Sequence, residues 1–149
     1  MLIVILTGFL QISEAKDPVS SFDLVLTYNE QEVHLQGNVT FSNSPGMRSF
    51  YFEDTNSIRC SIHVIRLGDD ILTAGTYPIG TDDEPRAGVV CGIPHDGDSK
   101  ERAASRSGKF VIDELEGNQV SGRFEARLIG GRTGIEYHIT GKFVALPHI

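Results

Sequence analysis

The sequence has no tryptophan, two cysteines and few basic residues. Two cysteines at no characteristic spacing argue against a structural zinc site, which takes four ligands at set spacings. Thirteen lysine and arginine residues stand against 20 aspartate and glutamate residues, giving a net charge of −7 and an isoelectric point of about 5.1. That sign opposes binding along a phosphate backbone, so no nucleic-acid partner is expected.

Apolar runs long enough to cross a bilayer are also absent, and the longest apolar run lies at the start of the chain. Residues 1–10 are apolar apart from one threonine and one glycine. The run is too short for the roughly 20 residues that cross a bilayer, but it has the length of a signal-peptide core. Ser13 and Ala15 are the small residues expected before a cut at Ala15/Lys16, and the run lacks the basic start of a full leader, as a truncated leader does.

The prediction is therefore a leader over residues 1–15, then a single β domain over residues 16–149. It places the protein in the periplasm or outside the cell, with no transmembrane span. No cysteine stands directly after the run, which argues against a lipid anchor attached at cysteine. The alternative is that residues 1–15 form a first strand buried on both faces.

What the chain does contain is enough apolar sequence for a core. Of its 149 residues, 40% are apolar or aromatic and 22% are charged, which is typical of one folded domain. Period-two alternation dominates after residue 20 and predicts strands, beginning with a hairpin of residues 22–28 and 33–41. Residues 94–107 are polar and predict a loop. The expected fold is all-β, an antiparallel β-sandwich or a small up-and-down barrel of about eight or nine strands.

Both cysteines fall on the apolar side of a strand. Cys60 is in phase with Ile58 and Ile62, and Cys91 is in phase with Val89 and Ile93. In an oxidising compartment a Cys60–Cys91 disulfide would close a loop of about 30 residues and stabilise the fold by roughly 3 to 4 kcal/mol on the loop-entropy model. The alternative is two buried free thiols.

The C-terminal third allows a prediction of strand register. A three-residue loop near residues 116–118 pairs Phe110 with Phe124 and Ile112 with Gly122, whereas a two-residue loop would put Phe124 opposite Val111.

The strand after the Gly130–Gly131 loop is predicted to pair Ala126 with Tyr137. The same register places Arg127 beside Glu136 on a solvated face.

Metal binding has candidates in the acidic loops. Carboxylates there could collect around a calcium ion, namely Asp82, Asp83, Glu84, Asp96 and Asp98. A calcium loop starting at Asp96 would have Lys100 at its fifth position, which has the wrong charge for a ligand. Solvated turn residues are therefore the favoured interpretation, and no cofactor is expected.

No arrangement of nucleophile and base is evident. The sequence has no Gly-x-Ser-x-Gly motif, and its five histidines are scattered, so we expect no enzymatic activity. A local group of basic residues, Lys100, Arg102 and Arg106, is the candidate contact for an acidic partner. The alternative is a solvated loop neutralised by Glu101.

Four segments carry a resemblance to known proteins: residues 75–77 (GTY), 107–112 (SGKFVI), 120–125 (VSGRFE) and 139–143 (ITGKF). Over residues 33–146 the chain resembles a diffuse group of small exported bacterial all-β proteins, often lipoproteins, with no assigned activity. The resemblance implies an all-β fold and a periplasmic or surface location. It transfers no catalytic residues, and the missing lipidation cysteine departs from the group.

Together these features predict an exported, non-enzymatic β domain that acts through contacts with a protein or an envelope component. The first alternative is a lipocalin-like carrier of a small apolar ligand, whose inward side chains would line a cavity. The second is a small hydrolase or metal-dependent enzyme, which would need convergent polar groups in a pocket.

Overall fold

The computed structural model describes residues 19–54, 57–65, 71–95 and 99–147. The predicted leader over residues 1–15 lies outside these residues, as do Asp96 and Asp98. Among the described residues, no helix is long and apolar enough to cross a membrane.

The described chain forms nine strands, which confirms the all-β prediction. They are β1 (Ser21–Tyr28), β2 (Gln31–Ser44), β3 (Met47–Asp54), β4 (Arg59–Ile65), β5 (Gly75–Ile79), β6 (Arg86–Pro94), β7 (Lys100–Glu116), β8 (Gln119–Gly130) and β9 (Glu136–Pro147).

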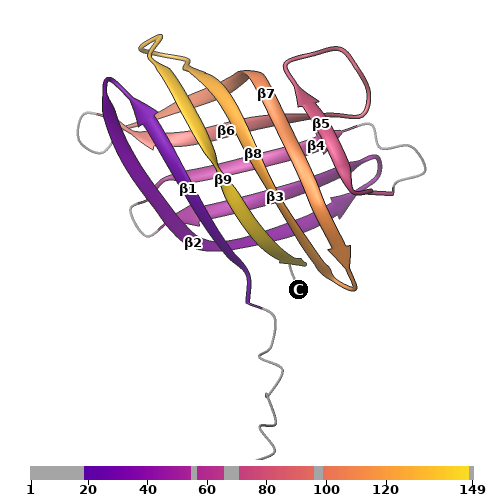
Figure 1. Cartoon of the computed structure of the whole chain (residues 1–149). Coiled ribbons are helices and arrows are strands. Elements are labelled where there is room, and N and C mark those ends of the chain that lie inside the picture. The colour runs from indigo at the N-terminus through magenta and orange to yellow at the C-terminus, as the bar shows by residue number, and fades with distance from the viewer. Residues whose placement is uncertain (1–18, 55–56, 66–70, 96–98, 148–149) are drawn as a thin grey trace, which may run out of the picture.

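All nine strands belong to one sheet that closes on itself, in the order β1-β2-β3-β4-β6-β5-β7-β8-β9 (Figure 1). β9 pairs with β1 to close the ring, so of the two predicted architectures the structure has the closed sheet and not two stacked sheets. The predicted first hairpin is present, with Leu24 opposite Leu35. The departure from a simple up-and-down order is β5, which lies between β6 and β7 although β6 and β7 also pair directly.

Phenylalanine rings fill the inside of the ring of strands. Phe50 contacts Phe110 and Phe143 with ring centroids 5.2 and 5.5 Å apart, and Phe110 stacks on Phe143 at 5.5 Å. Phe52 continues the cluster towards Phe124 at 5.6 Å. These rings come from strands on opposite sides of the ring, so the interior is packed as a core.

The β7–β8 hairpin has the predicted register but not the predicted loop. Phe110 pairs with Phe124 and Ile112 with Gly122, as expected. However, Glu116 pairs with Gln119, so the loop has two residues. A bulge between Ile112 and Glu114 adds the extra residue inside the strand and restores the register.

The predicted β8–β9 register is wrong by two residues. Ala126 pairs with Ile139, and Leu128 pairs with Tyr137. Hydrogen bonds from Gly130 N–H to Ile135 O and from Gly134 N–H to Gly130 O close a longer turn than the prediction assumed. Because the shift is even, the same side chains still face the core.

The prediction of a loop over residues 94–107 is wrong from residue 100 onwards, because β7 begins at Lys100. The alternation of large apolar side chains that predicts a strand is missing here, because small residues stand at inward positions. Ala103 is buried, and the Ser105 hydroxyl accepts a hydrogen bond from Val89 N–H of β6. The remaining inward position is occupied by a charged residue, Glu101, which is completely buried.

Candidate functional site

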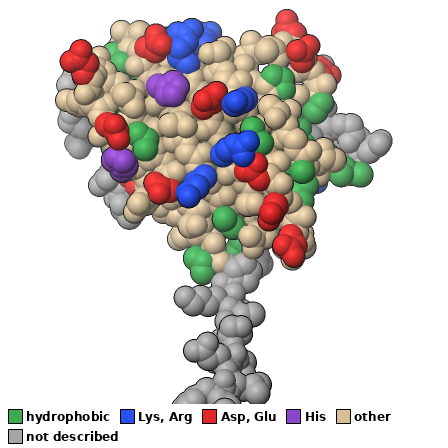
Figure 2. Space-filling model, viewed as in Figure 1, with side chains coloured by type: hydrophobic (Ala, Val, Ile, Leu, Met, Phe, Trp, Pro, Cys, Tyr) green, Lys and Arg blue, Asp and Glu red, His purple; other side chains and the backbone are tan. Residues whose placement is uncertain are grey.

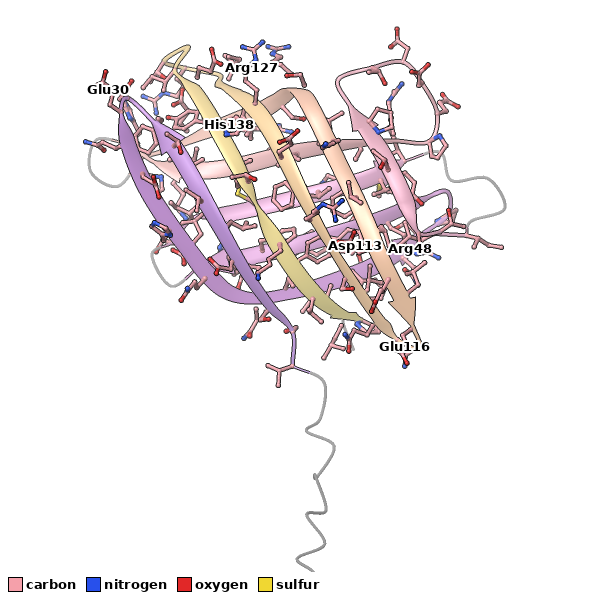
Figure 3. All side chains as sticks on the ribbon, in the orientation of Figure 1. Glu30, Arg48, Asp113, Glu116, Arg127 and His138 are labelled. Carbon is pink, nitrogen blue, oxygen red and sulfur yellow. A yellow bond between two sulfur atoms is a disulfide. The ribbon has the colours of Figure 1, made fainter. Side chains whose placement is uncertain are left out.

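The outer surface has two unlike faces. On the face of β7, β8 and β9, charges of both signs alternate and pair, as Figure 2 shows. The ion pairs there are Arg123–Asp113 at 2.6 Å, Arg127–Glu136 at 3.3 Å and Lys109–Glu125 at 3.8 Å. Figure 3 places Arg127 at one end of this face and Asp113 and Glu116 along the lower half of β7. We call it the charged face, and its charges largely neutralise each other.

The other face is formed by the outward side chains of β2, β3, β4 and β6, which cross behind β8 and β9 in Figure 1. Its residues are mostly uncharged, and several are small. We name it the Tyr51 face and define it by Asn38, Thr40, Tyr51, Glu53, Arg59, Ser61, His63 and Gly92.

Tyr51 is an aromatic side chain exposed in the middle of this face, with 41% of its surface accessible. Its ring stands edge-on to the His63 ring, with centroids 6.4 Å apart. Ser49 Oγ lies 2.8 Å from His63 Nδ1, and Ser61 Oγ lies 3.1 Å from His63 Nε2. With both ring nitrogens engaged, His63 is held in one orientation and supports Tyr51.

Burial lowers the pKa of His63 below its usual value. The imidazole is therefore neutral at neutral pH, and it adds no charge to the Tyr51 face. Ser49 is 2% exposed, so its hydroxyl orients the imidazole and is closed to any substrate. The Ser61-x-His63 spacing on a strand was a signal for this pair, since side chains two apart share a face.

Shallow hollows flank Tyr51 on both sides. One of about 750 Å³ lies over β2 and β3 and includes Asn38 and Thr40. The other, of about 350 Å³, lies over β4 and β6 and includes Arg59, Ser61 and Gly92. Tyr51 and Glu53 line both, so they stand between two places where a partner's side chains can sit.

The predicted disulfide is confirmed. Cys60 and Cys91 are directly opposite each other on β4 and β6, with Cα atoms 4.1 Å apart. The bridge lies on the inner side of the strands that carry the second hollow, and it secures their register. That register places Arg59 opposite Gly92.

The three basic residues predicted as a partner contact are divided by the structure. Lys100 lies opposite Pro94, and Arg102 lies opposite Gly92, at the edge of the Tyr51 face. Arg106 lies at a second β7 bulge, between Ser105 and Ser107, about 13 Å further along the strand. The prediction of one flexible basic loop is thus wrong for these residues.

Arg59 joins Arg102 at this edge, and it was not identified from the sequence. Its position directly before the inward-facing Cys60 indicated an outward side chain. Its nearness to Arg102 depends on the pairing of β4, β6 and β7, which no local pattern shows.

The metal candidates are not brought together. Asp82, Asp83 and Glu84 are exposed in the connection between β5 and β6, and Asp96 and Asp98 lie outside the described residues. Within the part of the chain that the structure describes, no group of three or more histidine, cysteine or acidic side chains could hold a metal ion.

Glu101 is the titratable group most perturbed by its surroundings. Burial alone would raise its pKa, but hydrogen bonds from Thr133, Tyr137 and Arg132 lower the pKa to about 2. The carboxylate accepts from Thr133 N–H, the Thr133 hydroxyl, Arg132 N–H and the Tyr137 hydroxyl, the last at 2.8 Å. It thereby holds the turn between β8 and β9, which is a structural role and not the expected neutralisation of basic neighbours.

No protein-family model, curated protein or solved structure matches this chain.

Proposed function

We propose that this protein is an exported, non-enzymatic domain that binds a protein or an envelope component through the Tyr51 face. The observation that carries the proposal is a large exposed aromatic side chain in mid-sheet, held on an oriented histidine and set between two hollows. A side chain ordered before binding loses little conformational entropy when a partner docks.

The chemistry of the face supports binding to a protein. Centres of protein interfaces are poor in charge, and tyrosine and arginine are the side chains that most often dominate their binding energy. Tyrosine combined with serine, glycine and asparagine is also the composition of antibody binding loops. The Tyr51 face has this composition, with Glu53 as its acidic residue and Arg59 as its basic residue.

The disulfide supports export. Disulfides persist in oxidising compartments such as the periplasm and the extracellular space, and they are rare in the cytosol. The leader-like start of the sequence leads to the same proposal from an independent feature.

Neither alternative function gains support. A carrier of an apolar ligand needs an internal cavity, but the described core is occupied by rings 5.2 to 5.6 Å apart. A serine hydrolase needs an accessible nucleophile beside a base that a third group orients, usually a carboxylate. Ser61 is the partly exposed hydroxyl beside His63, but the group that holds the other ring nitrogen is the buried hydroxyl of Ser49 and not a carboxylate.

The test is site-specific photo-cross-linking in the host. The full chain carries p-benzoylphenylalanine in place of Tyr51, and the matched control carries it in place of Thr140, an exposed residue of the charged face. We expect discrete adducts from position 51, absent from position 140, that reappear when the partner identified by mass spectrometry is purified and mixed with the protein. Adducts from position 140 alone, or none from position 51, would contradict the proposal.

A further inference from the structure

We infer that the partner presents carboxylates, as an acidic peptide segment, to a notch between Arg59 and Arg102 above the bare backbone of Gly92. The inference rests on the proposed function and assigns the chemistry of the partner at the edge of the Tyr51 face.

The notch follows from strand register. Gly92 of β6 pairs with Arg59 on one side and with Arg102 on the other. All three alternate with inward-facing neighbours, namely Cys60, Cys91 and Ala103, so the two arginine side chains leave the sheet on its outer side. Adjacent strands are about 4.8 Å apart, so the two arginines stand roughly 10 Å apart, a distance that their long side chains can bridge.

Gly92 leaves the space between them open. A Cβ atom built at this position would have one neighbour within 4 Å, the Arg59 carbonyl oxygen at 3.9 Å. A ligand oxygen can therefore approach the backbone of β6 with a guanidinium on either side.

The charges of the two arginines are available to a ligand. Arg59 Nε lies 3.6 Å from Glu53 Oε1. The two side chains are 71% and 69% exposed, so water and salt weaken this ion pair. Arg102 is exposed and makes no ion pair with a described residue. By contrast, Arg123 and Arg127 on the charged face are held by Asp113 and Glu136.

The ligand chemistry follows from the donors. Guanidinium groups bind carboxylates with two parallel hydrogen bonds, and two arginines around one gap suit an acidic segment better than a single charge. The protein as a whole carries −7, so an acidic partner is repelled by most of the surface and directed to the notch. A nucleic acid, with its continuous charge, would meet that repulsion along its whole length.

The experiment is an amide-shift NMR titration of the full chain with the peptide acetyl-Glu-Glu-Gly-Glu-Glu-amide. We expect the largest shifts at Gly92 and its neighbours, and weaker binding as salt rises from about 50 to about 500 mM. Arg102→Ala is expected to weaken binding about tenfold, since a charge-assisted hydrogen bond is lost, and Arg102→Lys is expected to fall between this variant and wild type. Arg127→Ala is the matched control, and its titration should equal that of wild type.

Shifts centred on the charged face, no shifts at all, or equal affinity for Arg102→Ala and wild type would each overturn the inference. These failures are distinct from failure of the proposed function, which depends on adducts at position 51. If a partner cross-links at position 51 while the acidic peptide leaves Gly92 unchanged, the Tyr51 face binds a partner of other chemistry.

Discussion

At the scale of single residues, Glu101 shows how hydrogen bonds keep a buried carboxylate ionised. Its pKa is lowered from 4.5 to about 2, so its contribution to stability is complete above about pH 4.5 and is lost as the pH falls through about 2. The partner hydroxyl changes in the opposite direction: burial and the hydrogen bond to Glu101 raise the pKa of Tyr137 to about 12.

Replacing Glu101 with Gln should therefore destabilise the protein at neutral pH. The amide keeps one acceptor oxygen but turns an NH₂ group towards donors, for an expected loss of about 1.5 to 3 kcal/mol. Urea unfolding of both proteins measures this loss, and the difference should shrink as the pH approaches about 2, where the wild-type carboxyl takes up a proton. An equal difference at both pH values would show that the charge of Glu101 does not matter.

Gly122 on β8 has a steric reason to be glycine. A Cβ there would collide with the Val111 carbonyl oxygen and lie 3.1 Å from the Phe143 ring. Gly122→Ala should lower the free energy of unfolding by about 1 to 3 kcal/mol, because the added methyl group overpacks this contact.

The matched control for that substitution is Gly88→Ala on β6, where a Cβ meets nothing within 4 Å. We expect a thermal midpoint equal to or slightly above that of wild type, because alanine restricts the unfolded chain. A similar loss in both variants would mean that the penalty arises from losing glycine and not from the close contact.

At the scale of elements, the bulge at Asp113 in β7 decides the register of the β7–β8 hairpin, the longest in the fold. Deleting Asp113 should leave Phe110 opposite Phe124, because the ladder becomes continuous across the former bulge. The free energy of unfolding should fall by less than about 1 kcal/mol, because the deletion removes the exposed ion pair between Asp113 and Arg123.

Cross-strand NOEs between Phe110 and Phe124 measure this outcome. The control is deletion of Val111, which lies within the regular ladder and would turn Phe110 out of the core, so that variant should not fold. If the Asp113 deletion paired Phe124 with Val111, the bulge would not be the source of the register.

At the scale of the whole molecule, the disulfide joins the neighbouring strands β4 and β6, which lie on the side of the ring opposite the charged face. Its sequence separation of 31 residues predicts a stabilisation of about 3 to 4 kcal/mol. The double variant Cys60→Ala, Cys91→Ala should unfold at correspondingly lower urea concentration. Unchanged stability would show that the strand pairing around Gly92 is sufficient without the bridge.

The filled interior makes a second prediction for the molecule as a whole. Fluorescent apolar probes should not bind the folded protein with the stoichiometry of a carrier, because phenylalanine rings occupy the centre. Saturable binding of one probe per folded chain would contradict this and revive the carrier interpretation.

Local sequence was enough to determine most of the strands and their faces. Alternation alone put Leu24, Cys60, Cys91 and Phe110 inside, and the two cysteines could be paired because both lay on the apolar sides of strands. It failed over residues 100–107, where a buried glutamate and small residues occupy inward positions that the pattern expects to be large and apolar. A buried charge becomes tolerable only when donors from another strand and its turn reach it, and here Thr133 and Tyr137 are 32 and 36 residues away in the chain.

The sequence by itself therefore determined an all-β fold, the inward and outward side chains and the candidate disulfide, because each depends on neighbours one or two positions apart. Only the tertiary structure decided that the sheet closes, that β7 carries bulges, and that Arg59 and Arg102 flank Gly92. Those features depend on pairing between distant strands, and a shift of one residue there would move every outward side chain to the core.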